Sequence, residues 1–503
     1  MNRTAIKFDV EKVVEVVLAF GASNDRLKLL DIILTKMMEI TSSDAGTLYT
    51  ISEDKLHFRI MRNNTLETFQ SFEENECHLP PIVLDKSNIQ NISAYAVINN
   101  EIVVVEDVYA GDERFNFSGP KKYDKLTGYQ TRGMLVIPIC TQGSGMEEDV
   151  FGVIQLMNPL DPETKEPSCY GDIHTPPIVP AMAKIAANTL SSAIYVKELR
   201  TLLSSIAKVL TQAIDERSVY SGNHTQNVAT YCERFATYLS KKFPEGSKYH
   251  FDEFHIERIV LAALLHDIGK IITPSSVMDK ASRLGESREG LKYRFELKKH
   301  QLEIERLKKL INDDEFAAQM ERLNNAWAFC EHINTSDYVT DEEIDEVQKL
   351  AQIKYKDADG NITSLLDEDN LLSLSIRTGT LTDAERVIMQ EHVAITERLL
   401  DKITVWKYYK DVPMWARHHH EFLDQSGYRS GLSGEQIPTE ARIITIMDIF
   451  DALVAKDRPY KKAVPLKKAF EILEQMANAD KLDKELVGLF IESRVWEGIV
   501  DED

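Results

Sequence analysis

Apolar and polar positions follow two kinds of period in the first third of the chain. Between Arg26 and Ile40 the apolar residues recur three and four positions apart, which predicts an amphipathic helix. Strand-like alternation follows in segments that turn residues separate. These segments are residues 45–51, 55–60, 101–105, 133–139 and 150–158. Residues 1–175 are therefore predicted to form an α+β domain.

A second helical segment carries apolar residues at heptad spacing. Its two rows are Met182, Thr189, Val196, Leu203 and Leu210, and Ile185, Ser192, Leu199, Ile206 and Ala213. A narrow stripe of period 3.5 favours a coiled coil, which here would be a parallel homodimer, and a single amphipathic helix packed on a domain is the alternative. Residues 176–215 join the first domain to the rest of the chain, so we expect them to form a signalling helix.

Residues 216–503 are predicted to form an all-α domain. The segment from about 281 to 376 is highly charged. Its pattern is mostly helical, since Leu297, Ile304 and Ile311 recur seven positions apart. Within them, residues 357–361 (Asp-Ala-Asp-Gly-Asn) suggest a calcium loop. The glycine has the wrong offset for an EF-hand, however, so a β-turn is predicted instead.

Composition narrows the functional classes. The net charge of −22 disfavours binding to a nucleic-acid polymer, which needs a basic face. The five cysteines are few and widely spaced, so a reducing, cytoplasmic environment fits better than a disulfide framework. The N-terminus lacks the apolar region of a secretion signal, and no apolar run approaches the ~20 residues that span a bilayer. We therefore expect no membrane association.

Several histidines and acids stand where packing alone does not explain them. His266-Asp267 ends the apolar stretch 259–265, and Asp448 interrupts the apolar helix 443–450. A lone histidine is more often a core or surface residue, but buried polar groups need partners, and a metal ion is one. Imidazoles mixed with carboxylates suit Fe, Mn or Zn. Two metals bridged by one carboxylate can activate water and hold the oxygens of a phosphoryl group, which points to phosphoester hydrolysis.

Two motifs resemble the HD superfamily, and within it the HD-GYP family of bacterial cyclic-dinucleotide phosphodiesterases. Residues 266–271 (His-Asp-Ile-Gly-Lys-Ile) look like the HD motif and its lysine. Residues 419–429 (His-His-Glu-Phe-Leu-Asp-Gln-Ser-Gly-Tyr-Arg) match the pattern HHExxDGxGYP imperfectly. The family's DG is Asp424-Gln425 here, and its GYP is the degenerate Gly427-Tyr428-Arg429. These departures touch the substrate side of the motif rather than the metal ligands.

The resemblance implies hydrolysis of a cyclic dinucleotide, with cyclic di-GMP favoured. It assigns His224, His266, Asp267 and Asp448 to one divalent metal, and Asp267, His392 and His419 to a second, with Fe or Mn favoured. His420 would be a ligand or a phosphate contact. Asp267 and Lys270 would act in catalysis, and the substrate contacts would be Lys270, His420, Tyr428 and Arg442. Some family members hold a third metal with a glutamate at the position of Tyr220, so two metals are expected here.

Family resemblance also sets the other expectations. In the family the HD pair and the next histidine lie close in sequence, so residues 281–376 are interpreted as an insertion. Residues 123–132 and 152–158 resemble a GAF domain, which implies either a small-ligand sensor or a module that only dimerises. Two alternatives to a regulated phosphodiesterase remain open. The chain could bind metal and nucleotide and signal by conformation with little turnover, or the GAF domain could be the main functional part.

Overall fold

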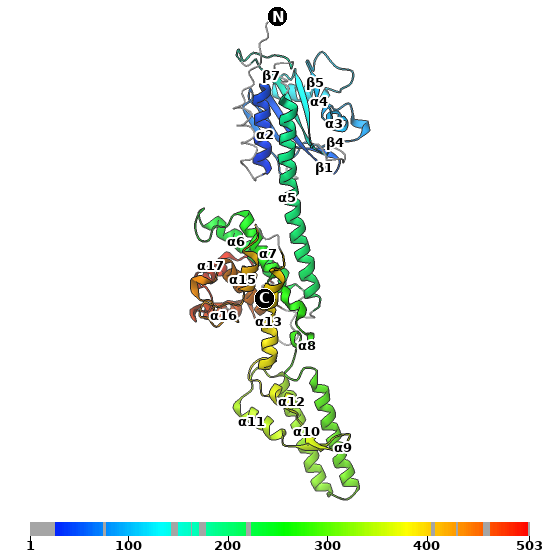
Figure 1. Cartoon of the computed structure of the whole chain (residues 1–503), viewed down its shortest axis with the longest axis vertical. Helices are drawn as coiled ribbons and strands as arrows, with labels where there is room; N and C mark the ends of the chain where they lie inside the picture. The colour runs from blue at the N-terminus through cyan, green and yellow to red at the C-terminus, as the bar shows by residue number, and fades with distance from the viewer. Residues whose placement is uncertain are drawn as a thin grey trace. The chain divides into compact units, whose positions relative to one another are not determined.

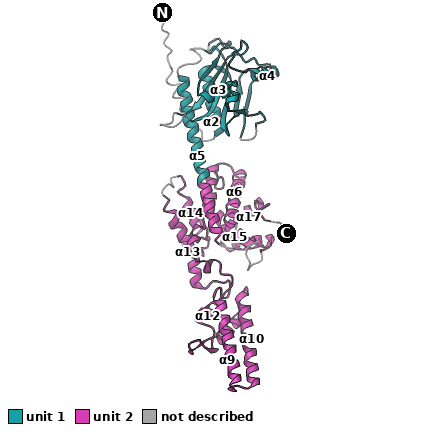
Figure 2. Cartoon of the chain, turned by 90° about the vertical axis from the view of Figure 1, so that its right-hand side faces the viewer, with its two compact units in different colours: residues 1–202 teal, residues 203–503 magenta. Residues whose placement is uncertain are grey.

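The computed structural model describes residues 26–73, 77–141, 149–161, 163–170, 178–217, 223–403, 408–428, 431–455 and 463–500. The chain divides into two compact units, Met1–Leu202 and Leu203–Asp503 (Figure 2). The boundary between them falls inside one long helix, α5 (Ile178–Asp215). Among the helices that the structure describes, none combines the length and apolar character needed to cross a bilayer.

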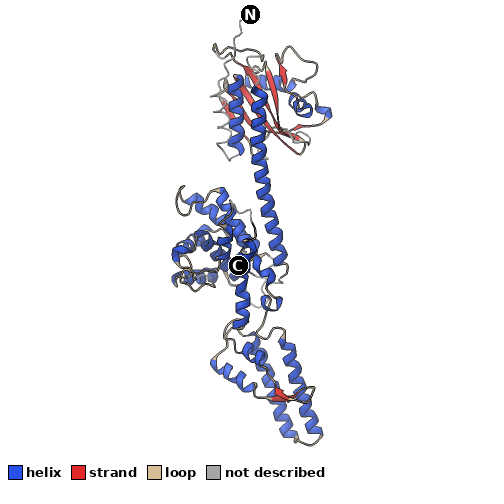
Figure 3. Ribbon diagram, in the orientation of Figure 1, coloured by secondary structure: helices blue, strands red, loops and turns tan. Residues whose placement is uncertain are grey.

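The described part of the N-terminal unit contains one antiparallel sheet of seven strands, shown in red in Figure 3. Its order is β3-β2-β1-β7-β6-β5, with β4 paired to β2. The strands are β1 (Ser43–Ser52), β2 (Lys55–Asn63), β3 (Thr68–Ser71), β4 (Ile82–Val83), β5 (Val103–Val105), β6 (Met134–Cys140) and β7 (Val150–Pro159). All five predicted strands are confirmed, and β3 and β4 are additional.

Helices cover both faces of this sheet. The helices of the unit besides α5 are α2 (Arg26–Thr41), the 3-10 helix η1 (Lys86–Asn88), α3 (Ile92–Asn99) and α4 (Ser118–Thr127). Figure 1 shows α2 and the first half of α5 side by side on one face of the sheet. Alternate residues of β6 point to opposite faces: Leu135 and Ile137 pack with α2 and the first half of α5, whereas Val136 packs with α3. Gly46 permits the close packing of α2, because an added Cβ would lie 2.8 Å from Leu34 Cδ1.

The helix α5 changes surroundings along its length. Its first residues belong to the core of the N-terminal unit, where Met182 and Leu190 are fully buried. Residues near its end are buried in the C-terminal unit, for example Ala207. From Tyr195 onward several large apolar side chains are exposed. They are Tyr195, Val196, Leu199, Leu202, Ile206, Val209 and Leu210. Met182 and Ile185, the first members of the two predicted rows, therefore pack inside the unit, whereas Val196, Leu199, Ile206 and Leu210 are exposed.

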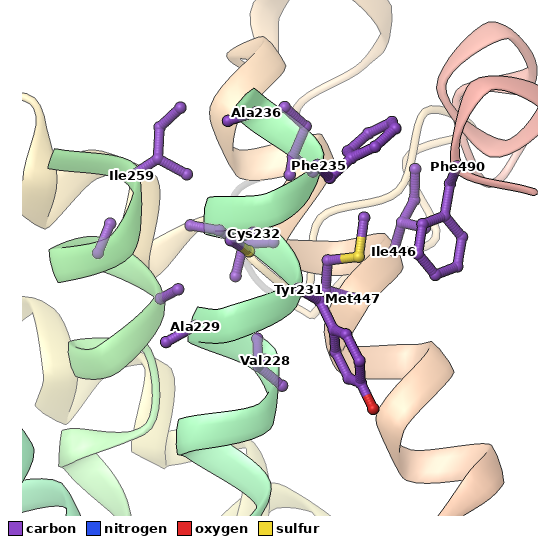
Figure 4. Packing of buried hydrophobic residues seen from close by; sticks show 14 of the residues in the cluster. Val228, Ala229, Tyr231, Cys232, Phe235, Ala236, Ile259, Ile446, Met447 and Phe490 are labelled. Atoms are coloured by element: carbon purple, nitrogen blue, oxygen red, sulfur yellow. The ribbon is translucent and has the colours of Figure 1, made fainter. Parts of the chain in front are cut away.

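The C-terminal unit is helical, as predicted. Its helices around the main core are α6 (His224–Lys242), α7 (Glu253–Leu265), η2 (Ile268–Ile272), α8 (Ser275–Met278), α13 (Asp383–Leu400), α14 (Val412–Arg417), η3 (Gly434–Gln436), α15 (Thr439–Val454), α16 (Leu466–Asn478) and α17 (Lys484–Ser493). Figure 4 shows α6 between its neighbours: Ile259 of α7 lies on one side, and Ile446 and Met447 of α15 with Phe490 of α17 lie on the other.

The segment interpreted as an insertion has its own hydrophobic core. It contains α9 (Ser287–Leu307), α10 (Asp313–Thr335), α11 (Asp341–Leu350), β8 (Lys354–Lys356), β9 (Ile362–Ser364) and α12 (Glu368–Leu374). The predicted turn is confirmed, because β8 and β9 form a hairpin in which Asp357 N donates to Asn361 O at 2.9 Å. Buried Arg283 ties the base of this segment by donating to the carbonyls of Ile333 and Ile376, at 2.7 and 2.8 Å.

Candidate metal centre

The predicted ligands come from five separate parts of the C-terminal unit. His224 is the first residue of α6, and His266 and Asp267 directly follow α7. His392 lies within α13, His419 and His420 follow α14, and Asp448 lies within α15. The side chains of His266 and His419 are completely buried, and those of His392, Asp267 and Asp448 nearly so. The fold thus brings all seven predicted metal ligands to one buried place.

Asp267 lies at the centre of this cluster, and its two oxygens face different histidines. Oδ2 is 3.2 Å from His266 Nε2 and 4.0 Å from His224 Nε2. Oδ1 is 3.3 Å from His392 Nε2 and 3.8 Å from His419 Nε2. A carboxylate with one oxygen toward each set of imidazoles has the arrangement that a bridging ligand needs.

Asp448 and His420 are the remaining two predicted ligands of the cluster around Asp267. Asp448 Oδ1 is 3.1 Å from His224 Nε2 and 3.9 Å from His266 Nε2. His420 Nδ1 is 3.9 Å from Asp448 Oδ2, and its ring lies 5.3 Å from the His392 ring between centroids. Three groups of nitrogen and oxygen atoms, each within 4.8 Å of one another, are close enough to share an ion. They are His224, His266 and Asp448; His266, Asp267 and His419; and His392, His419 and His420.

The backbone fixes which nitrogen of each histidine faces the cluster. The Nδ1–H groups of His266, His392 and His419 each donate to the carbonyl three residues earlier, at 2.6 Å. Because a carbonyl can only accept, each ring in its neutral form carries its proton on Nδ1 and leaves Nε2 unprotonated. Such a contact orients the ring and sets the tautomer that binds metal.

Buried atoms without partners test whether a cation fits here. Among the residues that the structure describes, His266 Nε2, His392 Nε2, His419 Nε2 and Asp267 Oδ1 are buried and have no hydrogen-bond partner. A buried polar atom left in this state costs about 1–3 kcal/mol. The three Nε2 atoms lie 3.2–3.8 Å from the Asp267 carboxylate, and acceptors cannot satisfy each other, whereas divalent cations between them can. The residues present therefore fit a metal.

The pKa values of the clustered histidines and of Asp267 are shifted by their surroundings. Burial lowers the pKa of His392 and, together with the neighbouring His420, lowers that of His419 well below its usual value, so both imidazoles are neutral. Burial opposes the charge on Asp267, but Lys270 and His266 overcome it and hold its pKa well below the usual range. His392, His419 and Asp267 therefore have at neutral pH the protonation states of metal ligands. Burial opposes protonation of His266 and His224, but Asp267 and Asp448 raise the pKa of His266, and Asp448 and Asp451 raise that of His224 to about 10. A metal ion bound by these two rings would displace a proton from each.

Three of the four predicted substrate contacts lie beside the cluster. Lys270 Nζ forms an ion pair with Asp267 Oδ2. The ring of Tyr428 lies 4.4 Å from that of His420 between centroids, and Tyr428 is 41% exposed. Arg442 is placed differently, because its guanidinium pairs with Asp483 at 2.8 Å and donates to the carbonyls of Gly434 and Ile437. These bonds anchor η3 and the start of α15.

The altered motif loop shows why the related motif has glycine at two positions. Gly427 has no room for a side chain, since an added Cβ would lie 2.7 Å from His420 O and from Glu421 Cα. Gln425 stands where the related motif has glycine, and its φ of 66° is in the left-handed region that glycine favours. Arg429 and Tyr220, which carry the other two predicted departures, lie outside the described residues.

Two supporting residues were missed by the sequence analysis. Asp451 Oδ2 accepts from His224 Nδ1 at 2.7 Å and so orients that ring. Thr396 Oγ1 accepts from Gly269 N at 3.0 Å and donates to His266 O at 3.1 Å, which joins the HD pair to α13. Asp451 could have been found, because it lies one helical turn after Asp448 and so shares its face of α15. Nothing in the sequence pattern distinguishes Thr396.

Comparisons with known proteins identify the two kinds of domain in the chain. Residues 25–167 match the GAF domain family, and residues 222–359 and 369–486 match HD domain families. The chain combines a GAF domain with an HD domain. This confirms both resemblances that the motifs indicated. A solved GAF domain from an Acinetobacter phosphoenolpyruvate-protein phosphotransferase aligns at 15% identity and a TM-score of 0.26, over 38% of this chain and 96% of that chain.

Curated relatives of the chain include phosphodiesterases of cyclic dinucleotides. A 3'3'-cGAMP-specific phosphodiesterase of Vibrio cholerae is 43% identical over 20% of this chain and 21% of its own length. A cyclic di-GMP phosphodiesterase response regulator of Xanthomonas campestris is 42% identical over 18% of this chain and 24% of its own length. A cyclic di-GMP phosphodiesterase of Thermotoga maritima is 36% identical over 20% of this chain. The match covers 27% of the length of this third relative. The chain therefore spans about a quarter of the length of each of these three relatives.

Proposed function

We propose that the HD domain is a metal-dependent phosphodiesterase that hydrolyses a cyclic dinucleotide, with cyclic di-GMP the favoured substrate. One observation carries the proposal: the buried, partnerless Nε2 atoms of His266, His392 and His419 all lie 3.2–3.8 Å from the carboxylate of Asp267. The relatives, which act on cyclic di-GMP or 3'3'-cGAMP, supply the substrate class. A phosphodiester is an anion, so an acidic protein needs a local positive site to bind it.

The residues would divide between two ions as follows. His224, His266 and Asp448 would hold one, His392 and His419 with His420 at the edge would hold the other, and Asp267 would bridge. Bound divalent metal would supply Lewis acidity and an activated water for attack on phosphorus. Fe and Mn are favoured, because both accept mixed imidazole and carboxylate ligands.

The chain's own groups would bind and orient the substrate. Lys270, whose ammonium already lies at Asp267, can reach a non-bridging phosphate oxygen and stabilise negative charge that develops there. Tyr428 presents a half-exposed ring beside His420, on which a nucleobase can stack. Arg442 would support the loop that carries these groups rather than contact the substrate, because its guanidinium is engaged by Asp483 and two carbonyls.

The decisive experiment measures metal and hydrolysis on the same sample. The full chain is purified anaerobically, its Fe, Mn and Zn contents are determined, and hydrolysis of cyclic di-GMP and 3'3'-cGAMP is followed by chromatography. We expect about two metal ions per chain and hydrolysis of at least one nucleotide. Bound metal without turnover of either would refute the enzyme and favour the alternative, a protein that binds nucleotide and signals by conformation. The left-handed Gln425 in the altered loop is the observation that favours this alternative.

The helix α5 supports a second part of the proposal, a parallel homodimer. Five exposed apolar residues repeat four and three positions apart along its middle. They are Tyr195, Leu199, Leu202, Ile206 and Val209, each 48–66% exposed. Two of them, Leu199 and Ile206, also belong to the predicted stripe. A row of this period on a helix is the contact surface of a coiled coil, and a second copy of the same helix is complementary to it.

Light scattering tests the dimer. Leu199→Glu/Ile206→Glu would place charge mid-row and cost several kcal/mol, on the order of a lost core pair. Lys197→Glu/Lys208→Glu on the exposed remainder of α5 is the matched control. A monomeric wild type at micromolar concentration would refute the dimer. Regulation by a small ligand at the GAF domain is also proposed, and it would appear as a ligand-dependent change in hydrolysis rate.

A further inference from the structure

The end of α5 reaches the start of α6 through a buried carboxylate. Asp215, the last residue of α5, accepts a hydrogen bond from Thr225 Oγ1 at 3.1 Å. Both residues are buried, with 7% and 2% exposure, so water cannot replace this bond readily. Thr225 directly follows His224, the predicted ligand that begins α6. The position of His224 is therefore tied to the end of α5.

A second contact joins the same end of α5 to the segment that follows the HD pair. Arg217 Nη1 donates to the carbonyl of Ile271, and Nη2 donates to the carbonyl of Thr273 at 3.1 Å. The carbonyls at the end of a helix lack partners within the helix, so they need an outside donor. Here the guanidinium supplies it for η2, the short helix that contains Lys270.

The opposite side of η2 is fixed to α13. Gly269 N donates to Thr396 Oγ1 at 3.0 Å, and a side chain at this position would collide with the carbonyl of His392. The segment between Asp267 and Thr273 is therefore held from two sides, by α13 and by Arg217. Gly269 already packs against α13 without room to move closer. The hydrogen bonds from Arg217 therefore determine how rigidly the rest of η2 is held.

We propose that Asp215 and Arg217 are positioning residues that tie the candidate metal centre to α5. Asp215 places His224 through Thr225, and Arg217 places η2 with Lys270. The same helix contributes Met182 and Leu190 to the core of the GAF domain, so one continuous element belongs to both domains. The proposal rests on the proposed function for its kinetic readout alone; the exchange and metal-affinity readouts do not need it.

Arg217 is tested in the full chain with Arg217→Gln, the conservative Arg217→Lys and the control Lys208→Gln, an exposed cation on α5. Hydrogen exchange of residues 268–273 is followed by mass spectrometry. Losing both bonds should raise exchange there about 30-fold, which corresponds to about 2 kcal/mol. Arg217→Lys, which can keep one bond, should lie between, and the control should match wild type. The kcat for the cyclic dinucleotide should fall about tenfold in Arg217→Gln, with KM and metal content little changed.

Asp215 is tested with Asp215→Ala and Asp215→Asn. The amide oxygen of asparagine can still accept the bond from Thr225, whereas alanine cannot. We expect Asp215→Ala to weaken Mn²⁺ binding about tenfold by calorimetry, as the loss of an outer support of a ligand does, and Asp215→Asn to stay within about twofold of wild type.

The outcomes separate this inference from the proposed function. Wild type that hydrolyses neither nucleotide would refute the proposed function and leave the exchange and Mn²⁺ measurements as valid tests of positioning. Exchange in residues 268–273 that is equal in wild type, Arg217→Lys and Arg217→Gln overturns the role of Arg217. If Arg217→Gln does not fold, Arg217→Lys carries the test alone. Equal Mn²⁺ affinity of Asp215→Ala and wild type overturns the role of Asp215.

Discussion

The GAF domain and the HD domain both bury ionisable side chains, but the hydrogen bonding of these side chains differs between the two domains. In the GAF domain, Asp124 accepts from Tyr109 Oη, Thr131 N and Thr131 Oγ1, each at 2.8 Å. Asp44 likewise accepts from Tyr129 Oη at 2.8 Å. These carboxylates link β1, α4 and the chain before β6, so their bonds help to define the fold.

In the HD domain the buried polar atoms point at each other instead. The Nδ1 atoms of His266, His392 and His419 are satisfied by the backbone, whereas their Nε2 atoms have no partner among the described groups. A polar network that closes on itself stabilises the structure that contains it. One that leaves acceptors open costs stability until a ligand arrives, which is why such atoms mark a functional site. The following predictions test this distinction.

The largest effect is expected from the bridging carboxylate. Asp267→Ala should lose the bound metal and all hydrolysis, with little change in helix content, because this side chain contacts both sets of histidines. The GAF counterpart, Asp124→Ala, should keep the metal and cost about 1–3 kcal/mol of stability by leaving its donors unsatisfied. Elemental analysis, circular dichroism and denaturant unfolding measure these outcomes. Equal metal content in Asp267→Ala and wild type would contradict the assignment.

A smaller effect is expected from the group that orients His224. Asp451→Asn should weaken metal binding about 10–100-fold, because partners of a ligand's second nitrogen contribute roughly that much. The change leaves the main core intact, since Asp451 bonds His224 Nδ1 rather than a core residue. Competition with a chelator measures the affinity. Asp483→Asn, which alters the ion pair of Arg442 instead, is the matched control and should leave affinity unchanged.

Metal removal should separate the stability of the two domains. At metal concentrations about 100-fold above Kd, binding stabilises the folded state by about 2.7 kcal/mol. For a domain of this size that corresponds to roughly 5–10 °C in Tm. A chelator should therefore lower the calorimetric transition of the HD domain by that amount and leave that of the GAF domain in place. A single shift shared by both transitions would contradict separate roles for the buried groups.

The smallest effect concerns the altered loop. Gln425→Gly should raise stability by up to about 1 kcal/mol, because glycine adopts the observed φ of 66° without the penalty of a side chain. Combined with Arg429→Pro it restores the motif, and hydrolysis should increase if the loop limits turnover. Denaturant unfolding and the hydrolysis assay measure the two results. An unchanged rate would show that the loop serves a different substrate or none.

Periodicity predicted the long elements of the fold and missed the short ones. The helix from Arg26 and the five principal strands could be predicted, because each is long enough for its buried face or faces to give a regular pattern. The helix α3 was not, since it has eight residues and five of them are buried, which leaves no clear polar face. Its start is set by the Asn91 side chain, which accepts from Ser93 N and Ala94 N. Caps of this kind need the three-dimensional structure to be recognised.

The residues of the candidate site could be predicted where they belong to a sequence motif. All seven proposed ligands meet in the structure, because the motif residues flank apolar helices that pack together. The place of Arg442 was not predictable, since its partner Asp483 lies before α17, far along the chain. Pairings of this type depend on tertiary packing. The strain at Gln425 also required the backbone angle, although the replacement of a motif glycine indicated where to look.

The helical insertion has a consequence for biosynthesis. A ribosome releases His224, His266 and Asp267 before the insertion, and His392, His419 and Asp448 only after it. The insertion folds around its own core, and Arg283 joins its two ends, so the distance between the halves of the site does not grow with the length of chain between them. The full set of ligands nevertheless exists only once Asp448 has emerged. A nascent chain stalled in the insertion therefore has only half of the candidate site.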